Sequence, residues 1–390
     1  MHYIRFLKTP RIQLNHGSLL LKAVLTVTTD LGETFYPHDL DLVATVRSLA
    51  PEGEIFLRRK VRWEGATLAV PVTFNLSNQD VEWPACVHVE VRNASRLAAT
   101  FPFLAPVLDV WSGPLNPTKG RMESGILVER RFVSAAQRTL SLLEETGDSI
   151  ARHLWDGSQA LAQHIDHTIS LDTASSPLPL LEYVLASATY RKLAVLELGC
   201  GCGTVGISLA QAVPDCDVLL TDLHEVRDLT EANIERMNAA IASKVAFFPL
   251  DWTQELPEKL QTRANDLIVV SECTYNTDTL QPLVSTLVSL IMRSPKAIII
   301  VSTKTRHASE AIFFDMMKKA NFIEHDRARV PLPGIPGTGY ADGATDVGLY
   351  VFRGPDYQLS PSPRASRDDG DVPTSTPRRV AFKRSISHGS

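Results

Sequence analysis

The pattern of apolar and polar positions changes near residue 115. Before that point, short runs alternate between apolar and polar residues, which is the period of a half-buried β-strand, and turn-forming residues separate the runs. The expected strands cover residues 18–27, 39–46, 54–61, 66–74 and 86–91. We therefore predict a smaller antiparallel β domain over residues 1–115, with a sandwich-like arrangement.

Residues 126–354 instead alternate between strand-like and helix-like stretches. Helices are expected over residues 134–145 and 148–166, and the strands and helices that follow have a βαβ rhythm, which indicates an α/β fold with a doubly wound parallel sheet. The expected strands cover residues 193–198, 217–221, 245–250, 266–271 and 297–302, with 322–330 and 347–353 as two closing strands. A Pro- and Gly-rich loop at 331–344 is either a pocket rim or a plain connector.

The last part of the chain, residues 355–390, contains almost no apolar residues and is rich in Ser, Pro, Arg and Asp. Such a segment cannot offset the entropy of ordering, so we predict a disordered tail. Its basic end, with Ser385 and Ser387 beside the charges, is either a localisation or phosphorylation element or a solvated tail.

Composition narrows the class of protein. The 390 residues are 44% hydrophobic, with a net charge of −5, so a large core is expected and a general nucleic-acid binder is disfavoured. No apolar run is long enough to span a membrane and no secretory signal is apparent, so we expect a cytoplasmic protein, with the nucleus as an alternative. The five cysteines lack paired spacing, which predicts free thiols and no metal site. We expect a monomer.

A glycine-dense turn carries the clearest chemistry. Residues 193–206 run from an apolar strand into glycines 199, 201 and 203, with Glu197 just before them. Glycines let the backbone approach a ligand closely, and the N-terminus of the following helix faces the same place. The turn also fits the dinucleotide pattern G-x-G-x-x-G, but a buried carboxylate at Glu197 would repel a pyrophosphate and favours the cationic S-adenosylmethionine. A turn without a ligand is the remaining alternative.

Polar residues also follow three further predicted strands, and ligands of open α/β sheets lie at the carboxyl ends of the strands. Asp222 is about twenty residues past the turn, where it can accept ribose hydroxyls, and Asp251 with Trp252 suits an adenine. Glu272 and Tyr275 follow the fourth strand, at the expected methyl-transfer position. Each has another interpretation: Asp222 as a helix cap, Trp252 as core, and Glu272 with Tyr275 as a structural pair.

These motifs resemble the seven-strand lysine-specific protein methyltransferases (methyltransferase family 16), and in particular the valosin-containing-protein lysine methyltransferase group. The resemblance rests on LWDG at 154–157, VLELGCGCGTVG at 195–206, TDLHEVRDL at 221–229, LDW at 250–252 and ECTY at 272–275. It covers roughly residues 126–353 and implies a seven-stranded Rossmann-like methyltransferase sheet.

The predicted site combines the strand ends with this resemblance. The predicted cofactor-binding residues are Trp155, Glu197, Gly199, Cys200, Gly201, Gly203, Asp222, Leu223, Asp251, Trp252 and Ser271, and the predicted catalytic residues are Glu272 and Tyr275. Two features depart from the family pattern: Glu272 stands where the family has aspartate in Asp-x-x-Tyr, and cysteines occupy the glycine turn. The first 110 residues match no part of the family's catalytic core, so substrate choice could reside there.

The resulting hypothesis is S-adenosylmethionine-dependent transfer of a methyl group to a lysine of a protein substrate. The acceptor nitrogen must be neutral, and a free lysine has a pKa near 10.4, so we expect Glu272 to position the amine and help its proton leave while Tyr275 shapes the channel. The alternatives are a small-amine N-methyltransferase of the nicotinamide type, a catalytically silent scaffold, and a nicotinamide-dependent oxidoreductase that Glu197 disfavours.

Overall fold

A computed structural model of the protein describes residues 1–50, 53–65, 67–92, 104–134, 138–147, 149–170, 176–306, 311–334 and 346–357. Met1–Tyr357 form one unit by their internal contacts. The predicted tail lies outside the described residues from residue 358 onward, as does most of the loop predicted at 331–344.

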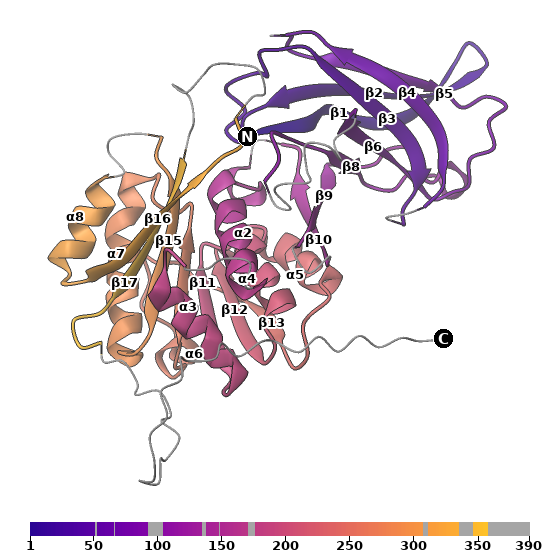
Figure 1. Cartoon of the computed structure of the whole chain (residues 1–390). Coiled ribbons are helices and arrows are strands. Elements are labelled where there is room, and N and C mark those ends of the chain that lie inside the picture. The colour runs from indigo at the N-terminus through magenta and orange to yellow at the C-terminus, as the bar shows by residue number, and fades with distance from the viewer. Residues whose placement is uncertain are drawn as a thin grey trace, which may run out of the picture. The chain divides into compact units, whose positions relative to one another are not determined.

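The first part of the chain forms two β-sheets, as its alternating pattern predicts. The strand order is β5-β2-β1-β7 in the four-stranded sheet and β10-β9-β8-β6-β3-β4 in the six-stranded sheet (Figure 1). Their bounds are β1 (His2–Asn15), β2 (Ser18–Thr28), β3 (Leu40–Ser48), β4 (Ile55–Trp63), β5 (Val70–Asn75), β6 (Ala85–Val91), β7 (Val107–Leu108), β8 (Val110–Ser112), β9 (Leu127–Val133) and β10 (Thr139–Glu145). Ile4 and Leu25 of one sheet share a core with Val46 and Val87 of the other, so the sandwich is confirmed.

The helix predicted over residues 134–145 is wrong, because β9 and β10 form a hairpin there and join the six-stranded sheet. Within β10, Leu140, Leu142 and Glu144 are buried and the residues between them are not. That period of two belongs to a strand with one face against a core. The six-stranded sheet therefore continues past residue 115, the predicted end of the β domain, to Glu145.

The second part contains a seven-stranded sheet in the order β13-β12-β11-β14-β15-β17-β16. The strands are β11 (Leu193–Leu198), β12 (Cys216–Asp222), β13 (Lys244–Pro249), β14 (Leu267–Ser271), β15 (Ile298–Lys304), β16 (Ile323–Pro331) and β17 (Asp346–Arg353). The first five are parallel and β17 is antiparallel to both its neighbours. The chain winds outward in one direction from β11 and in the other from β14, so the doubly wound prediction is confirmed.

Helices cover both faces of this sheet (Figure 1). They are α2 (Asp156–Ser170), α3 (Pro179–Ala186), α4 (Thr204–Ala212), α5 (Arg227–Arg236), α6 (Glu258–Gln261), α7 (Thr277–Arg293) and α8 (Ala311–Lys319), with 3-10 turns η1 (Pro117–Lys119), η2 (Ile150–Arg152), η3 (Ser187–Thr189) and η4 (His224–Val226). Alternate residues of β11 enter the two cores: Val195 packs with Leu161 and Val205 on one face, and Leu196 packs with Leu283 on the other. None of the described helices is long and apolar enough to cross a membrane.

The β-sandwich and the seven-stranded sheet share buried side chains. Tyr3 of β1, Phe132 of β9 and Leu140 of β10 belong to the same core cluster as Leu161 of α2 and Val205 of α4. Burying apolar area in a common cluster is what holds two such parts together. The first residues of the chain are thus part of the packing that supports the edge of the sheet.

Candidate functional site

A pocket of about 470 Å³ opens at the carboxyl ends of β11, β12, β13 and β14, where the winding direction of the sheet changes. This is the place where open α/β sheets bind their ligands. The predicted residues that line it are Trp155, Glu197, Gly199, Cys200, Gly201, Asp222, Leu223, Asp251, Trp252, Ser271, Glu272 and Tyr275. The pocket lining does not include Gly203, which is the N-cap of α4 and closes the turn by donating its N–H to the carbonyl of Cys200.

The glycine turn needs its glycines for conformation and for space. Gly199, Gly201 and Gly203 have φ of 65°, 51° and 78°, in the left-handed region that favours glycine. A Cβ on Gly199 would lie 2.5 Å from the Cys273 sulfur and 3.2 Å from the Trp252 ring. The absence of that carbon keeps the floor of the pocket open at this point.

Asp222 holds the turn in place. Its Oδ2 accepts the N–H of Gly201 at 2.8 Å, and its Oδ1 accepts the N–H of Leu223 at 2.7 Å. The following η4 turn has no side-chain cap, so the interpretation of Asp222 as a helix cap is wrong. Burial raises the pKa of this carboxyl. Each carboxylate oxygen has two lone pairs, so both can accept a further hydrogen bond from a ligand hydroxyl.

Glu197 lies under the turn and is buried, with 2% of its surface exposed. Its Oε2 accepts the N–H of Gly206 at 2.8 Å. Burial, together with the negative charge of Asp222, raises the pKa of Glu197 to about 8 although the Gly206 hydrogen bond lowers it. No cation among the described residues contributes to the pKa of Glu197, and a positively charged ligand would favour its ionised form.

Three buried polar atoms of the pocket residues have no hydrogen-bond partner among the described residues: Trp252 Nε1, Ser271 Oγ and Glu272 Oε1. Buried polar groups are nearly always hydrogen-bonded, so such atoms suit a polar ligand. Trp252 also packs against the core beside α7, which makes it both a core residue and part of the pocket wall. Asp251 instead forms a local turn, in which its Oδ1 accepts the N–H and hydroxyl of Thr253. These bonds lower its pKa, and it keeps a charge at the rim.

Glu272 directly follows β14 and has a positive φ of 56°, a backbone conformation that costs energy outside glycine. Its Oε2 accepts a hydrogen bond from Arg306 Nη1 at 2.5 Å, and its backbone N–H donates to the carbonyl of Ser302. Burial raises the pKa of Glu272 to about 7 although Arg306 lowers it. The carboxylate is bonded to Arg306 rather than to Tyr275, whose ring lines the pocket and is half exposed.

Acidic side chains dominate the described lining of the pocket. Five carboxyl-bearing residues are among its described lining residues, and neither lysine nor arginine is. These five are Glu197, Asp222, Glu225, Asp251 and Glu272. An anionic pyrophosphate would be repelled here, whereas a cation would be attracted. Among the described residues, no group of three or more His, Cys, Asp or Glu side chains could hold a metal ion.

Sequence reasoning missed two parts of the site. The segment from Ser149 to His153 forms one wall, but it falls within the helix predicted over residues 148–166, which in fact begins at Asp156. The Ala151 carbonyl lies so near the turn that a Cβ on Gly201 would be 2.9 Å from it. Arg306 was also missed. It contacts Glu272 from just beyond the end of another strand, and no local sequence pattern predicts that ion pair.

This chain is similar in sequence to known proteins. Residues 134–320 match the sequence model of the family described as lysine methyltransferase. A UPF0665 family protein of Schizosaccharomyces pombe is 29% identical over 325 residues, which are 80% of this chain and 91% of that protein. Calmodulin-lysine N-methyltransferase of Arabidopsis thaliana is 31% identical over 127 residues, which are 32% of this chain and 38% of that protein.

A solved structure of N-methyltransferase NodS from Bradyrhizobium japonicum, in complex with S-adenosylhomocysteine, aligns with 50% of this chain and 99% of its own. It is 17% identical, with a TM-score of 0.33.

Proposed function

We propose that this chain, an S-adenosylmethionine-dependent methyltransferase whose residues 134–320 match the sequence model of the lysine methyltransferase family, methylates a lysine side chain of a protein substrate. The observation that carries the proposal is a pocket at the switch point of the sheet that is lined by carboxylates and by no described lysine or arginine. Such a pocket suits a cofactor with a sulfonium and an ammonium group, and it suits a cationic acceptor as well.

The residues present fit the cofactor. The open glycine turn gives room at Gly199, Asp222 offers lone pairs to ribose hydroxyls, and the unpartnered Trp252 Nε1 and Ser271 Oγ offer polar contacts. Glu197 lies beneath the turn as a carboxyl with a raised pKa, and a bound cation would favour its ionised form. When bound, S-adenosylmethionine supplies an electrophilic methyl group on a sulfonium sulfur.

Glu272 is the residue that we assign to the acceptor amine. A lysine must lose a proton before its nitrogen can act as a nucleophile, and a base works best when its pKa is near the operating pH. The raised pKa of Glu272, about 7, meets that condition. Its Oε2 is bonded to Arg306 while Oε1 has no partner among the described residues, so Oε1 is the oxygen that takes the proton. Tyr275, half exposed at the rim, orients the amine.

The experiment is transfer of tritium from labelled S-adenosylmethionine into the proteins of a cell lysate, followed by mass spectrometry of the labelled residue. We expect label on lysine. Glu272→Gln should abolish transfer and leave the affinity for S-adenosylhomocysteine unchanged, while Glu255→Gln, at an exposed position of the loop after β13, should change neither. Label on a small amine and on no protein would contradict the protein-substrate proposal, as would donor binding without any transfer.

A further inference from the structure

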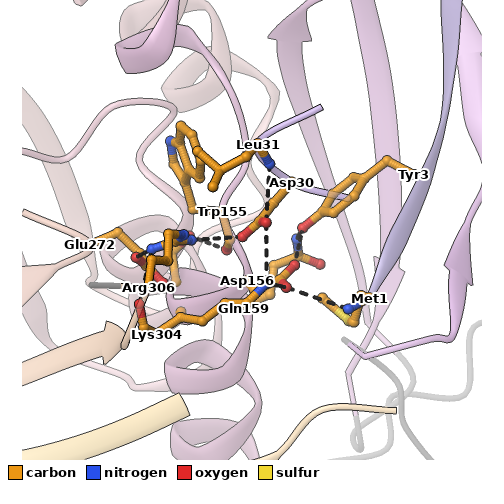
Figure 2. A network of polar contacts seen from close by, with 12 residues as sticks. Met1, Tyr3, Asp30, Leu31, Trp155, Asp156, Gln159, Glu272, Lys304 and Arg306 are labelled. Carbon is orange, nitrogen blue, oxygen red and sulfur yellow. Dashed lines mark hydrogen bonds and ion pairs between the residues drawn. The ribbon is translucent and has the colours of Figure 1, made fainter. Parts of the chain in front are cut away.

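The turn after β2 brings a buried carboxylate to the edge of the α/β sheet. Asp30 is 4% exposed, and its two oxygens contact two cations at the end of β15 and just beyond it. Oδ1 lies 3.1 Å from Lys304 Nζ, and Oδ2 lies 2.7 Å from Arg306 Nη2 (Figure 2). More than 270 positions of sequence separate the partners of each pair. The contact is therefore created by the fold alone.

Arg306 connects Asp30 to the acceptor side of the pocket. One guanidinium nitrogen, Nη2, donates to Asp30, and the other, Nη1, donates to Glu272 Oε2 at 2.5 Å. The guanidinium carbon lies 5.4 Å from the centre of the Trp155 ring. A planar guanidinium held at both ends has one orientation, because its donors are fixed relative to each other. Figure 2 shows Arg306 between Asp30 and Glu272.

A second branch of the network fixes the start of α2. Lys304 Nζ also donates to Asp156 Oδ2 at 2.7 Å, and the Tyr3 hydroxyl donates to Asp156 Oδ1 at 2.7 Å. Gln159 donates to the Tyr3 oxygen. Asp156 is the residue after Trp155, so β1 and the turn after β2 hold both the helix start and the cation beside Glu272.

We infer that Asp30 is a positioning residue for methyl transfer, which orients Arg306 so that the guanidinium occupies Glu272 Oε2 and leaves Oε1 for the acceptor amine. The inference rests on the proposed function. It assigns a role to the N-terminal β-sandwich, since Asp30 lies outside the segment 134–320 that matches the family. The sandwich then completes the transfer site from a distance, without touching the cofactor.

The charge of Asp30 has a second effect on Glu272. Apart from burial, the groups that act on Glu272 are Arg306, which lowers its pKa, and Asp30 and Asp156, which raise it. Lys304 contacts the two aspartates. Removing the charge of Asp30 should therefore lower the pKa of Glu272, because one repelling carboxylate disappears and Arg306 loses its competing partner. A rate that depends on ionised Glu272 would then rise at lower pH.

The test compares Asp30→Asn with the matched control Glu33→Gln, which removes an exposed carboxylate from the same turn. For Asp30→Asn we expect methyl transfer at least tenfold slower at the optimum, a rising limb of the pH–rate profile moved to lower pH, and an affinity for S-adenosylhomocysteine within twofold of wild type. Asp30→Glu keeps the negative charge, so the rising limb of its pH–rate profile should lie close to that of wild type. Glu33→Gln should match wild type throughout.

Two outcomes overturn the inference: an Asp30→Asn rate and pH profile equal to those of Glu33→Gln, or a slower rate with an unmoved profile. If Asp30→Asn does not fold, Arg306→Lys takes its place, because one ammonium cannot hold both carboxylates as a guanidinium does. A wild-type transfer rate in that variant would equally contradict the inference.

Failure of the proposed function has a different signature, namely wild-type protein that labels no lysate protein. In that case the inference is tested by titrating Glu272 itself. Carbon NMR monitors the carboxyl groups, and the Glu272→Gln variant identifies the Glu272 signal. A midpoint that falls in Asp30→Asn supports the inference, and an unchanged midpoint refutes it.

Discussion

Replacing Glu197 with glutamine should remove a pH-dependent loss of stability from the ligand-free protein. The carboxyl is fully buried, and its pKa is raised from 4.5 to about 8. Between those values the native state keeps the proton and the unfolded chain does not, so the stability contributed by protonated Glu197 is complete below pH 4.5 and is lost as the pH rises toward 8. At about 1.4 kcal/mol per tenfold change in proton affinity, the loss at pH 8 is on the order of 4 kcal/mol.

The assay is urea unfolding of wild type and Glu197→Gln at pH 5, 6.5 and 8. The difference between their free energies of unfolding cancels the other titrating groups, and the wild type should lose about 3 kcal/mol more than the variant from pH 5 to pH 8. Saturating S-adenosylmethionine should reduce that slope, because a bound cation favours the ionised carboxylate. If the difference in free energy of unfolding between wild type and variant does not change with pH, Glu197 is not a buried carboxyl with a raised pKa.

Three further outcomes are expected. Gly199→Ala places a Cβ 2.5 Å from the Cys273 sulfur at a residue with positive φ. Calorimetry should then find no binding of S-adenosylhomocysteine, and thermal melting should show a destabilisation of about 1–3 kcal/mol. Binding with wild-type affinity would show that the Cβ does not crowd the pocket. Glu144→Gln leaves the buried Arg130 guanidinium without its ion pair. The free energy of unfolding in urea should fall by about 3–5 kcal/mol, whereas loss of a surface ion pair costs under about 1 kcal/mol. Cys86 and Cys216 are buried and do not line the pocket, so iodoacetamide at pH 8 should alkylate them only after unfolding; mass spectrometry of native protein checks this.

Local patterns were enough to predict the seven-stranded sheet and most of the pocket. The central strands β14 and β15 are mostly apolar because both their faces are buried, and the polar residues that follow the parallel strands meet at one edge. The glycine turn was equally readable, because positive φ and close packing need glycine at the same positions. Twelve of the thirteen predicted site residues line one pocket, and one of these, Trp155, was predicted from the family resemblance rather than from a strand end or the turn.

The hairpin of β9 and β10 and the network around Arg306 were not predictable in the same way. Leu140 and Leu142 are followed by Leu143, so the apolar positions of β10 fit a helix as well as a strand, and only pairing with Phe132 and the rest of β9 selects the strand. Asp30 and Arg306 lie 276 positions apart, and their ion pair follows from how the sandwich packs on the sheet. Long-range contacts of this kind leave no local pattern.

Titration calorimetry of the folded protein with S-adenosylhomocysteine measures whether this pocket binds the demethylated cofactor. We expect saturable heat for one site per chain in wild type and weaker binding in Asp222→Asn, which alters the hydrogen bonds that hold the Gly201 turn. No heat from folded wild-type protein, or equal binding by wild type and Asp222→Asn, would contradict the assignment of this pocket.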